Sequence, residues 1–247
     1  MDGAERPDPL ARLDATAEAI AALRDIFAAE EPLDEVLGRV ARTAAGAIPA
    51  ADAVSITVLT EQSPRTAACT DERVVDLDRA QYQSGRGPCL ESAQTQRPVR
   101  VEIAHATQRW PEFAAAARRV GIRACLSVPL LVGDGAPKMV GSLNVYSYTA
   151  SAFDPFDEGL MRIYTVTAGE AIENARRWQQ SRETVAHLER ALTSRADIDQ
   201  AKGALMAVHG CTAEEAFQRL VEQSQRSNIR VHDIARRLLH SLTSTDR

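Results

Sequence analysis

The chain has 247 residues, of which 45% are hydrophobic and 26% charged, and its net charge at pH 7 is −5. This composition is typical of one or two soluble domains, and the acidic balance disfavours a uniformly nucleic-acid-binding chain, because phosphate contacts need local Lys and Arg. The four cysteines lack metal-ligand spacing, and no apolar run approaches the roughly 18 residues of a membrane span. We therefore expect a cytoplasmic protein without a bound metal.

Residues 1–31 are expected to form a polar tail followed by an amphipathic helix that begins near Leu10. A second helix is expected from Pro32, whose fixed φ suits a first helical turn. Neither polar face is rich in Lys or Arg, so packing on the chain's own domain or on a partner helix is favoured over membrane contact.

Residues 32–176 are expected to form one α+β domain. Residues 54–59 alternate in polarity and are β-branched, which indicates a strand, and residues 65–70 are its candidate hairpin partner. Further strands are expected at 99–102, 124–131 and 139–146. Intervening helices lead us to expect a mostly antiparallel sheet with helices on one side.

Several motifs in this region resemble the GAF sensor domain. They are Gly85-x-Gly87-Pro88-Cys89-Leu90, Trp110-Pro111-x-Phe113, Gly121-Ile122, Ser127-Val128-Pro129-Leu130, Gly141-Ser142-Leu143-Asn144-Val145-Tyr146 and Phe153. The resemblance implies a six-stranded sheet that encloses a small-molecule pocket or serves only as a dimer scaffold. It identifies no ligand and implies no fixed cofactor. The candidate pocket residues are Cys89, Trp110, Cys125, Ser127 and Asn144.

Three features of this domain invite other functions, and each has a plainer interpretation. Cys89 could be a redox sensor if it follows a helix N-terminus, but free cysteines are more often buried core residues. His105 could ligate haem, but a surface histidine is the simpler interpretation. Asp157 and Glu158 match half of a cyclic-nucleotide signature whose other half is absent, and we interpret them as first-turn residues that favour the helix dipole.

A long helix is expected from Pro155 to Gly210, and residues 177–195 are its linker portion. Ala171, Trp178, Val185 and Leu192 recur at steps of seven, with Leu188 between two of them. Polar residues interrupt the seam elsewhere. The pattern nevertheless indicates a coiled-coil-like linker and a homodimer.

Residues 196–243 are expected to form three helices, the first being the end of the long helix. Gly210 suits a helix C-terminus, and Thr212 with Glu215 forms an N-terminal capping box. A second break is expected at Ser227 and Asn228. A core of this size is marginal alone, so dimerisation is expected to support it.

This segment resembles the ANTAR family of RNA-binding antiterminator modules. The matching residues are Gln200, Ala201, Lys202, Gly203, Leu205, Met206, Thr212, Glu215, Ala216, Phe217, Leu220, Ser224, Gln225, Asn228, Asp233, Ile234 and Ala235. The whole chain thus resembles the GAF- and ANTAR-containing antitermination regulators of actinobacterial type. The resemblance implies binding to stem-loops of nascent transcripts, which prevents terminator formation.

The candidate RNA-binding residues lie at two places in this segment. Gly203 in a helix interior costs about 1 kcal/mol relative to Ala, so either RNA or the third helix is expected to approach it closely. The turn before the third helix is polar and basic, which suits phosphates and splayed loop bases, although most helix–helix turns are polar. The candidates are Gln200, Lys202, Gly203, Met206, Ser224, Gln225, Arg226, Asn228, Arg230 and Arg236.

No catalytic motif is recognisable, so we do not expect an enzyme. The leading hypothesis is an RNA-binding antitermination regulator controlled by a small-molecule or protein signal. Two alternatives stay open. One is a protein-interaction adaptor with a GAF dimerisation scaffold, and the other is a helix-turn-helix DNA-binding regulator whose recognition helix would carry Arg236 and Arg237.

Overall fold

The computed structural model describes residues 8–27, 30–59, 63–132 and 138–243. The expected N-terminal tail therefore lies largely outside the described residues. The chain divides into two compact units, Met1–Gln179 and Gln180–Arg247. Among the described residues, no helix is both long and apolar enough to cross a bilayer.

The first unit is built on an antiparallel sheet of five described strands. They are β1 (Ala53–Leu59), β2 (Pro64–Cys69), β3 (Val99–Glu102), β4 (Ala124–Val132) and β5 (Lys138–Ser147), in the order β2-β1-β5-β4-β3. All four strand pairs are antiparallel. The expectation of six strands is wrong for the described residues, because the segments outside these five carry helical rather than alternating patterns.

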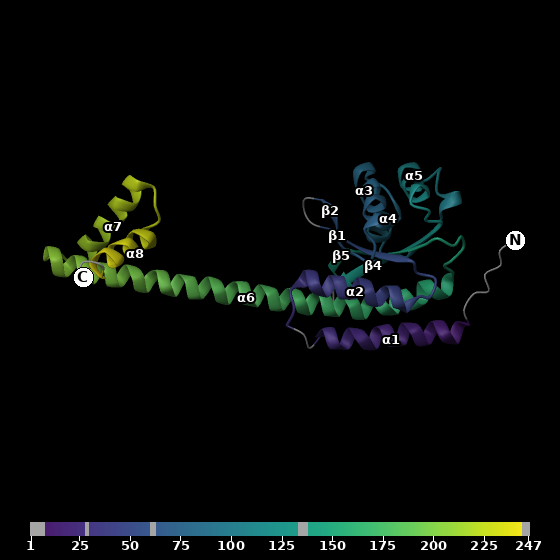
Figure 1. Cartoon of the computed structure of the whole chain (residues 1–247), viewed down its shortest axis with the longest axis horizontal. Coiled ribbons are helices and arrows are strands. Elements are labelled where there is room, and N and C mark those ends of the chain that lie inside the picture. The colour runs from purple at the N-terminus through teal and green to yellow at the C-terminus, as the bar shows by residue number, and fades with distance from the viewer. Residues whose placement is uncertain (1–7, 28–29, 60–62, 133–137, 244–247) are drawn as a thin grey trace. The chain divides into compact units, whose positions relative to one another are not determined.

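Helices cover both faces of this sheet, so the expectation of helices on one side is wrong. One core contains α1 (Pro9–Phe27), α2 (Leu33–Ala47) and the first part of α6 (Pro155–His209). The other contains α3 (Val75–Ser84) and α5 (Pro111–Arg119), and α4 (Pro88–Thr95) lies on the same side (Figure 1). The physical reason is visible in the strands, because β1 is buried at six consecutive positions and therefore needs cover on both faces.

Two glycines allow close backbone packing in this unit. A side chain at Gly141 in β5 would collide with the carbonyl of Thr57 in β1. A side chain at Gly169 would collide with the carbonyl of Leu131, so α6 can pass close to β4 only with glycine at this position.

The second unit contains the last part of α6, α7 (Ala213–Ser227) and α8 (Val231–Thr243). The long helix is continuous from Pro155 to His209, as the sequence predicts. The predicted capping box is also present, since the Thr212 hydroxyl accepts from the Glu215 amide and the Glu215 carboxylate accepts from the Thr212 amide. The core is small, with Ala201, Leu220, Ile234 and Ala235 buried.

Candidate nucleic-acid interface and sensor interior

Gly203 lies on an open face of α6. A side chain added there would meet nothing within 4 Å, so of the two alternatives for Gly203, packing of the third helix over it is wrong. The helices pack instead on Ala201, which is fully buried two residues earlier. No described contact within the chain offsets the cost of about 1 kcal/mol that glycine brings to a helix interior.

The neighbours of Gly203 on α6 are accessible. Met206 is 38% exposed, and Gln200 is also exposed. The Lys202 side chain is half-buried, and its Nζ lies 3.1 Å from Asp199 Oδ1. Such a surface ion pair is worth about 0–1 kcal/mol, so an incoming phosphate can compete for the lysine.

The end of α7 and the turn before α8 contain residues with structural roles. The Ser224 hydroxyl donates to the carbonyl of Ile229, and Asn228 adopts the left-handed conformation at φ 53° that ends α7. The formation of this turn therefore explains why Ser224 and Asn228 occupy these positions, without requiring a role in RNA binding. Gln225 is exposed, and Arg226 is paired with Glu222 at 3.0 Å.

Arg230 and Arg236 come together at a groove of about 690 Å³ within the second unit. We call it the α6–α8 groove, and its lining residues are Ala186, His187, Glu189, Arg190, Ala191, Thr193, Ser194, Arg230, His232 and Arg236. Arg236 Nε lies 3.5 Å from Asp197 Oδ2. Lys202, Gly203 and Met206 do not line this groove, so the structure separates the predicted RNA-binding residues into two groups.

Sequence reasoning missed one arginine and two histidines of this groove, Arg190, His187 and His232. The first two fall in the stretch assigned to the linker. Arg190 precedes Asp197 by seven residues, which is two helical turns, and Asp197 is in contact with α8. The spacing alone gave no usable signal, because the contact of Asp197 with α8 is visible only in the structure.

The five predicted sensor residues are all buried, with exposed fractions between 0 and 6%. The Asn144 amide donates to Ser55 Oγ at 3.1 Å and to Thr57 Oγ1 at 2.9 Å. Cys125 Sγ lies 3.7 Å from Ser127 Oγ, two residues further along the same strand, β4. Trp110 belongs to the same core cluster as Cys125.

Cys89 is the second residue of α4 and is fully buried, and its amide donates to Gln81 Oε1 at 3.0 Å. Burial raises the pKa of its thiol well above the usual value, and nearby Asp78 acts in the same direction. A thiol that stays protonated is a poor nucleophile, which favours the core interpretation over a redox sensor.

Asp78 is a central polar residue of the sensor interior that sequence reasoning missed. Its side chain is fully buried and accepts hydrogen bonds from the Tyr146 hydroxyl at 2.5 Å and from Thr66 Oγ1 at 2.9 Å. Burial raises its pKa to about 6, and the hydrogen bonds from Tyr146, Ser55 and Thr66 oppose that rise. An Asp between Leu77 and Arg79 in a helix gives no local signal that it is buried.

Two buried polar atoms near this cluster have no partner among the described residues. They are Gln81 Nε2 and Ser92 Oγ, both in fully buried residues. A buried donor without a partner costs about 1–3 kcal/mol, so bound water or a ligand atom is the usual explanation. This part of the interior is therefore the candidate for ligand contact.

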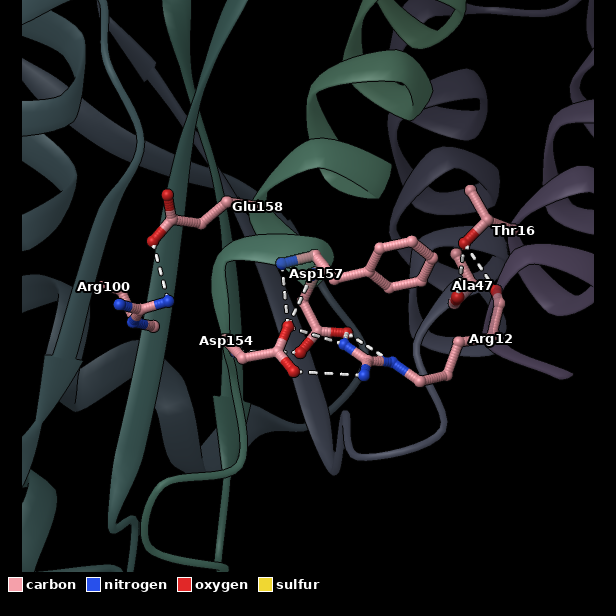
Figure 2. A network of polar contacts seen from close by, with 8 residues as sticks. Arg12, Thr16, Ala47, Arg100, Asp154, Asp157 and Glu158 are labelled. Carbon is pink, nitrogen blue, oxygen red and sulfur yellow. Dashed lines mark hydrogen bonds and ion pairs between the residues drawn. The ribbon is translucent and has the colours of Figure 1, made fainter. Parts of the chain in front are cut away.

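Asp157 is already engaged within the chain. Asp154 and Asp157 cap the start of α6 reciprocally, because the Asp154 carboxylate accepts from the Asp157 amide and the Asp157 carboxylate accepts from the Asp154 amide. Both carboxylates also bind Arg12 of α1 (Figure 2). Asp157 thus stabilises the first turn of α6, in agreement with its interpretation from the sequence. Its carboxylate is therefore not available to a cyclic nucleotide.

The sequence profile of the GAF domain matches residues 30–173, more than half of the chain. The chain belongs to the GAF domain family. The profile of the ANTAR domain matches residues 186–239. The GAF and ANTAR resemblances are therefore confirmed, and the protein is a regulator that carries a sensor domain. No protein with a curated description matches the sequence.

Solved structures share the GAF fold. A protein named as a GAF sensor from Burkholderia vietnamiensis is 18% identical, with a TM-score of 0.51 over 67% of this chain and 98% of the other. The free methionine-R-sulfoxide reductase of Neisseria meningitidis, solved with its substrate, is 17% identical, with a TM-score of 0.52 over 67% of this chain and 92% of the other. Because the same fold occurs in a sensor and in an enzyme, these likenesses describe the fold alone.

Proposed function

We propose that this GAF protein is a cytoplasmic transcription antitermination regulator that binds stem-loops of nascent transcripts through its ANTAR domain. The ANTAR match over residues 186–239 carries the proposal. Local charge supports it, because residues 226–240 contain four arginines against Asp233 in a chain that is acidic as a whole. Electrostatic capture of the RNA backbone needs such a local excess.

The RNA-binding residues proposed from the sequence stay candidates at two places. On α6, Gly203 offers a side-chain-free surface beside Lys202. At the start of α8, Arg230 forms no ion pair with a described residue and is exposed. Gln200, Met206 and Gln225 add exposed groups that can contact loop bases.

The GAF domain is proposed to receive the signal that controls RNA binding. The partnerless atoms of Gln81 on α3 and Ser92 on α4 support a small polar ligand rather than an apolar one. A protein signal acting on the surface of the domain is the alternative.

A homodimer is the proposed binding form. Val185, Leu188 and Leu192 of α6 are 51%, 57% and 69% exposed and recur at helical spacing. Large apolar side chains aligned on one helix face are stabilised by pairing with a second helix. Two copies would present two ANTAR domains to tandem stem-loops.

RNA binding can be tested by titrating the full-length protein with a labelled tandem hairpin, using duplex DNA and unstructured RNA of equal length as competitors. Preferential binding of the hairpin supports the proposal. Preference for duplex DNA would favour the helix-turn-helix alternative. Absence of nucleic-acid binding together with capture of one protein partner would favour the adaptor alternative.

A further inference from the structure

The α6–α8 groove has the size and charge of an anion site. Its volume of about 690 Å³ falls within the range of roughly 300–1,000 Å³ that is typical of ligand sites. Three arginines line it, Arg190 from α6, Arg230 from the end of the α7–α8 turn and Arg236 from α8. Glu189 is the carboxylate among its lining residues.

Two of these arginines, Arg190 and Arg230, are available to bind an anion. Arg190 Nε donates to the carbonyl of Ala186 at 3.1 Å, and neither Arg190 nor Arg230 is paired with a carboxylate among the described residues. Arg236 is partly neutralised by Asp197 at 3.5 Å, and its side chain is 57% exposed. Two arginines from separate segments therefore line the same groove, and neither forms an ion pair with a described carboxylate.

The start of α8 adds to this field. The carbonyl of Arg230 accepts from the amides of Asp233 and Ile234, so the helix begins at the groove. An arginine side chain cannot cap a helix N-terminus, in contrast to Thr212 at the start of α7. The helix dipole therefore reinforces the arginines, and Asp233, which lies 3.1 Å from His232 Nε2, opposes them in part.

We propose that the α6–α8 groove binds the sugar–phosphate backbone of the RNA, with Arg190 and Arg230 each contacting phosphate oxygens. The inference rests on the proposed function and deepens it by assigning a phosphate subsite. This subsite includes Arg190, which lies in residues 177–195, the segment that the sequence analysis assigned to the linker. Guanidinium groups bind phosphate oxygens bidentately. Such contacts fix the position of the RNA and read no bases.

The test compares the variants Arg190→Ala and Arg219→Ala in the full-length protein. Both remove one positive charge, but Arg219 is exposed on α7 and does not line the groove. Binding to a tandem hairpin RNA is measured at several salt concentrations. Arg190→Ala should weaken binding about tenfold and reduce the slope of log affinity against log salt by about 0.7–0.9, the value of one phosphate contact. Arg219→Ala should change affinity less than about twofold.

Two further arms separate a phosphate contact from other roles. Arg190→Lys should restore most of the salt slope. The loss caused by Arg190→Ala should also be equal for hairpins with altered loop bases, because a backbone contact is independent of sequence.

The outcomes discriminate between the two levels of the proposal. If the unaltered protein binds the hairpin and Arg190→Ala behaves like Arg219→Ala, the phosphate subsite is wrong while RNA binding stands. A loss confined to the native loop would indicate a base contact and would also overturn the inference. If the unaltered protein binds no hairpin, the proposed function fails and the subsite fails with it.

Discussion

The guanidinium of Arg12 donates two hydrogen bonds to the carboxylate of Asp154, at 3.1 and 2.8 Å, and so fastens α1 to the first turn of α6 (Figure 2). The same guanidinium lies 2.5 Å from Asp157 Oδ1 and 4.8 Å from the centre of the Phe156 ring. Arg12 and Asp157 are buried, and Asp154 is 20% exposed at its side chain. Residues at the two ends of the first unit thus form one network.

Arg12→Ala should destabilise the first unit by about 3 kcal/mol, because it leaves two neighbouring carboxylates without their counter-ion. Denaturant unfolding followed by circular dichroism measures the change. Arg24→Ala is the matched control, since Arg24 is an exposed arginine of the same helix and should cost at most about 0.5 kcal/mol. Equal effects of the two substitutions would contradict the structural role of Arg12.

Arg12 should also determine part of the acid sensitivity. Its hydrogen bonds hold the pKa of Asp154 well below the usual range. A lowered pKa in the folded state gives stability that is present above the unfolded value of about 3.9 and is lost as pH falls below it. Between about pH 5 and about pH 2, the Arg12→Ala variant should therefore lose less stability than the unaltered protein.

Asp78 should have the opposite pH dependence, because its folded pKa is raised to about 6. The stabilising contribution of the protonated Asp78 carboxyl is fully present below about pH 4 and is lost as pH rises towards about 6. Above about pH 6 the contribution of Asp78 to stability no longer changes with pH. Asp78→Asn should therefore make the protein more stable at pH 8, by about 3 kcal/mol at most, and should remove this part of the pH profile. The control is Asp76→Asn at an exposed position of α3. A less stable Asp78→Asn protein at pH 8 would contradict the assignment.

Gly203→Ala should raise thermal stability and lower RNA affinity at the same time. The added methyl group meets nothing within 4 Å in the chain, and alanine favours the helix by about 1 kcal/mol. Gly159 is the matched control, because it lies in the same helix and also meets nothing within 4 Å. Stabilisation by both substitutions, with RNA binding weakened only at position 203, is the expected result. Unchanged RNA binding by Gly203→Ala would remove this glycine from the interface.

Leu188→Glu combined with Leu192→Glu should convert a dimer into a monomer, because it places charges on the exposed apolar stripe of α6. Sedimentation equilibrium measures the mass, and Gln180→Glu adds a charge at an exposed position of the same helix as a control. A dimer that persists in the double variant would place the interface elsewhere.

Local sequence signals predicted the elements well, and long-range packing set the limits of prediction. The five described strands, the continuous α6 and the capping box at Thr212 follow from periodicity and turn chemistry. Asp78 gave no signal because its burial depends on Thr66 and Tyr146, which are distant in sequence. Arg190 was missed because a solvent-facing helix and one wall of a groove have the same local pattern. The sequence also could not predict whether another helix packs over Gly203, because this depends on the tertiary packing of the helices.

The most direct test of the account is the affinity of the folded full-length protein for a tandem hairpin RNA as a function of salt. We expect log affinity to fall linearly with log salt, by about 0.7–0.9 for each phosphate contacted, and the slope to decrease when Lys202 or Arg230 is replaced by alanine. Salt-independent affinity, or no binding at low ionic strength by a folded dimer, would contradict the central claim.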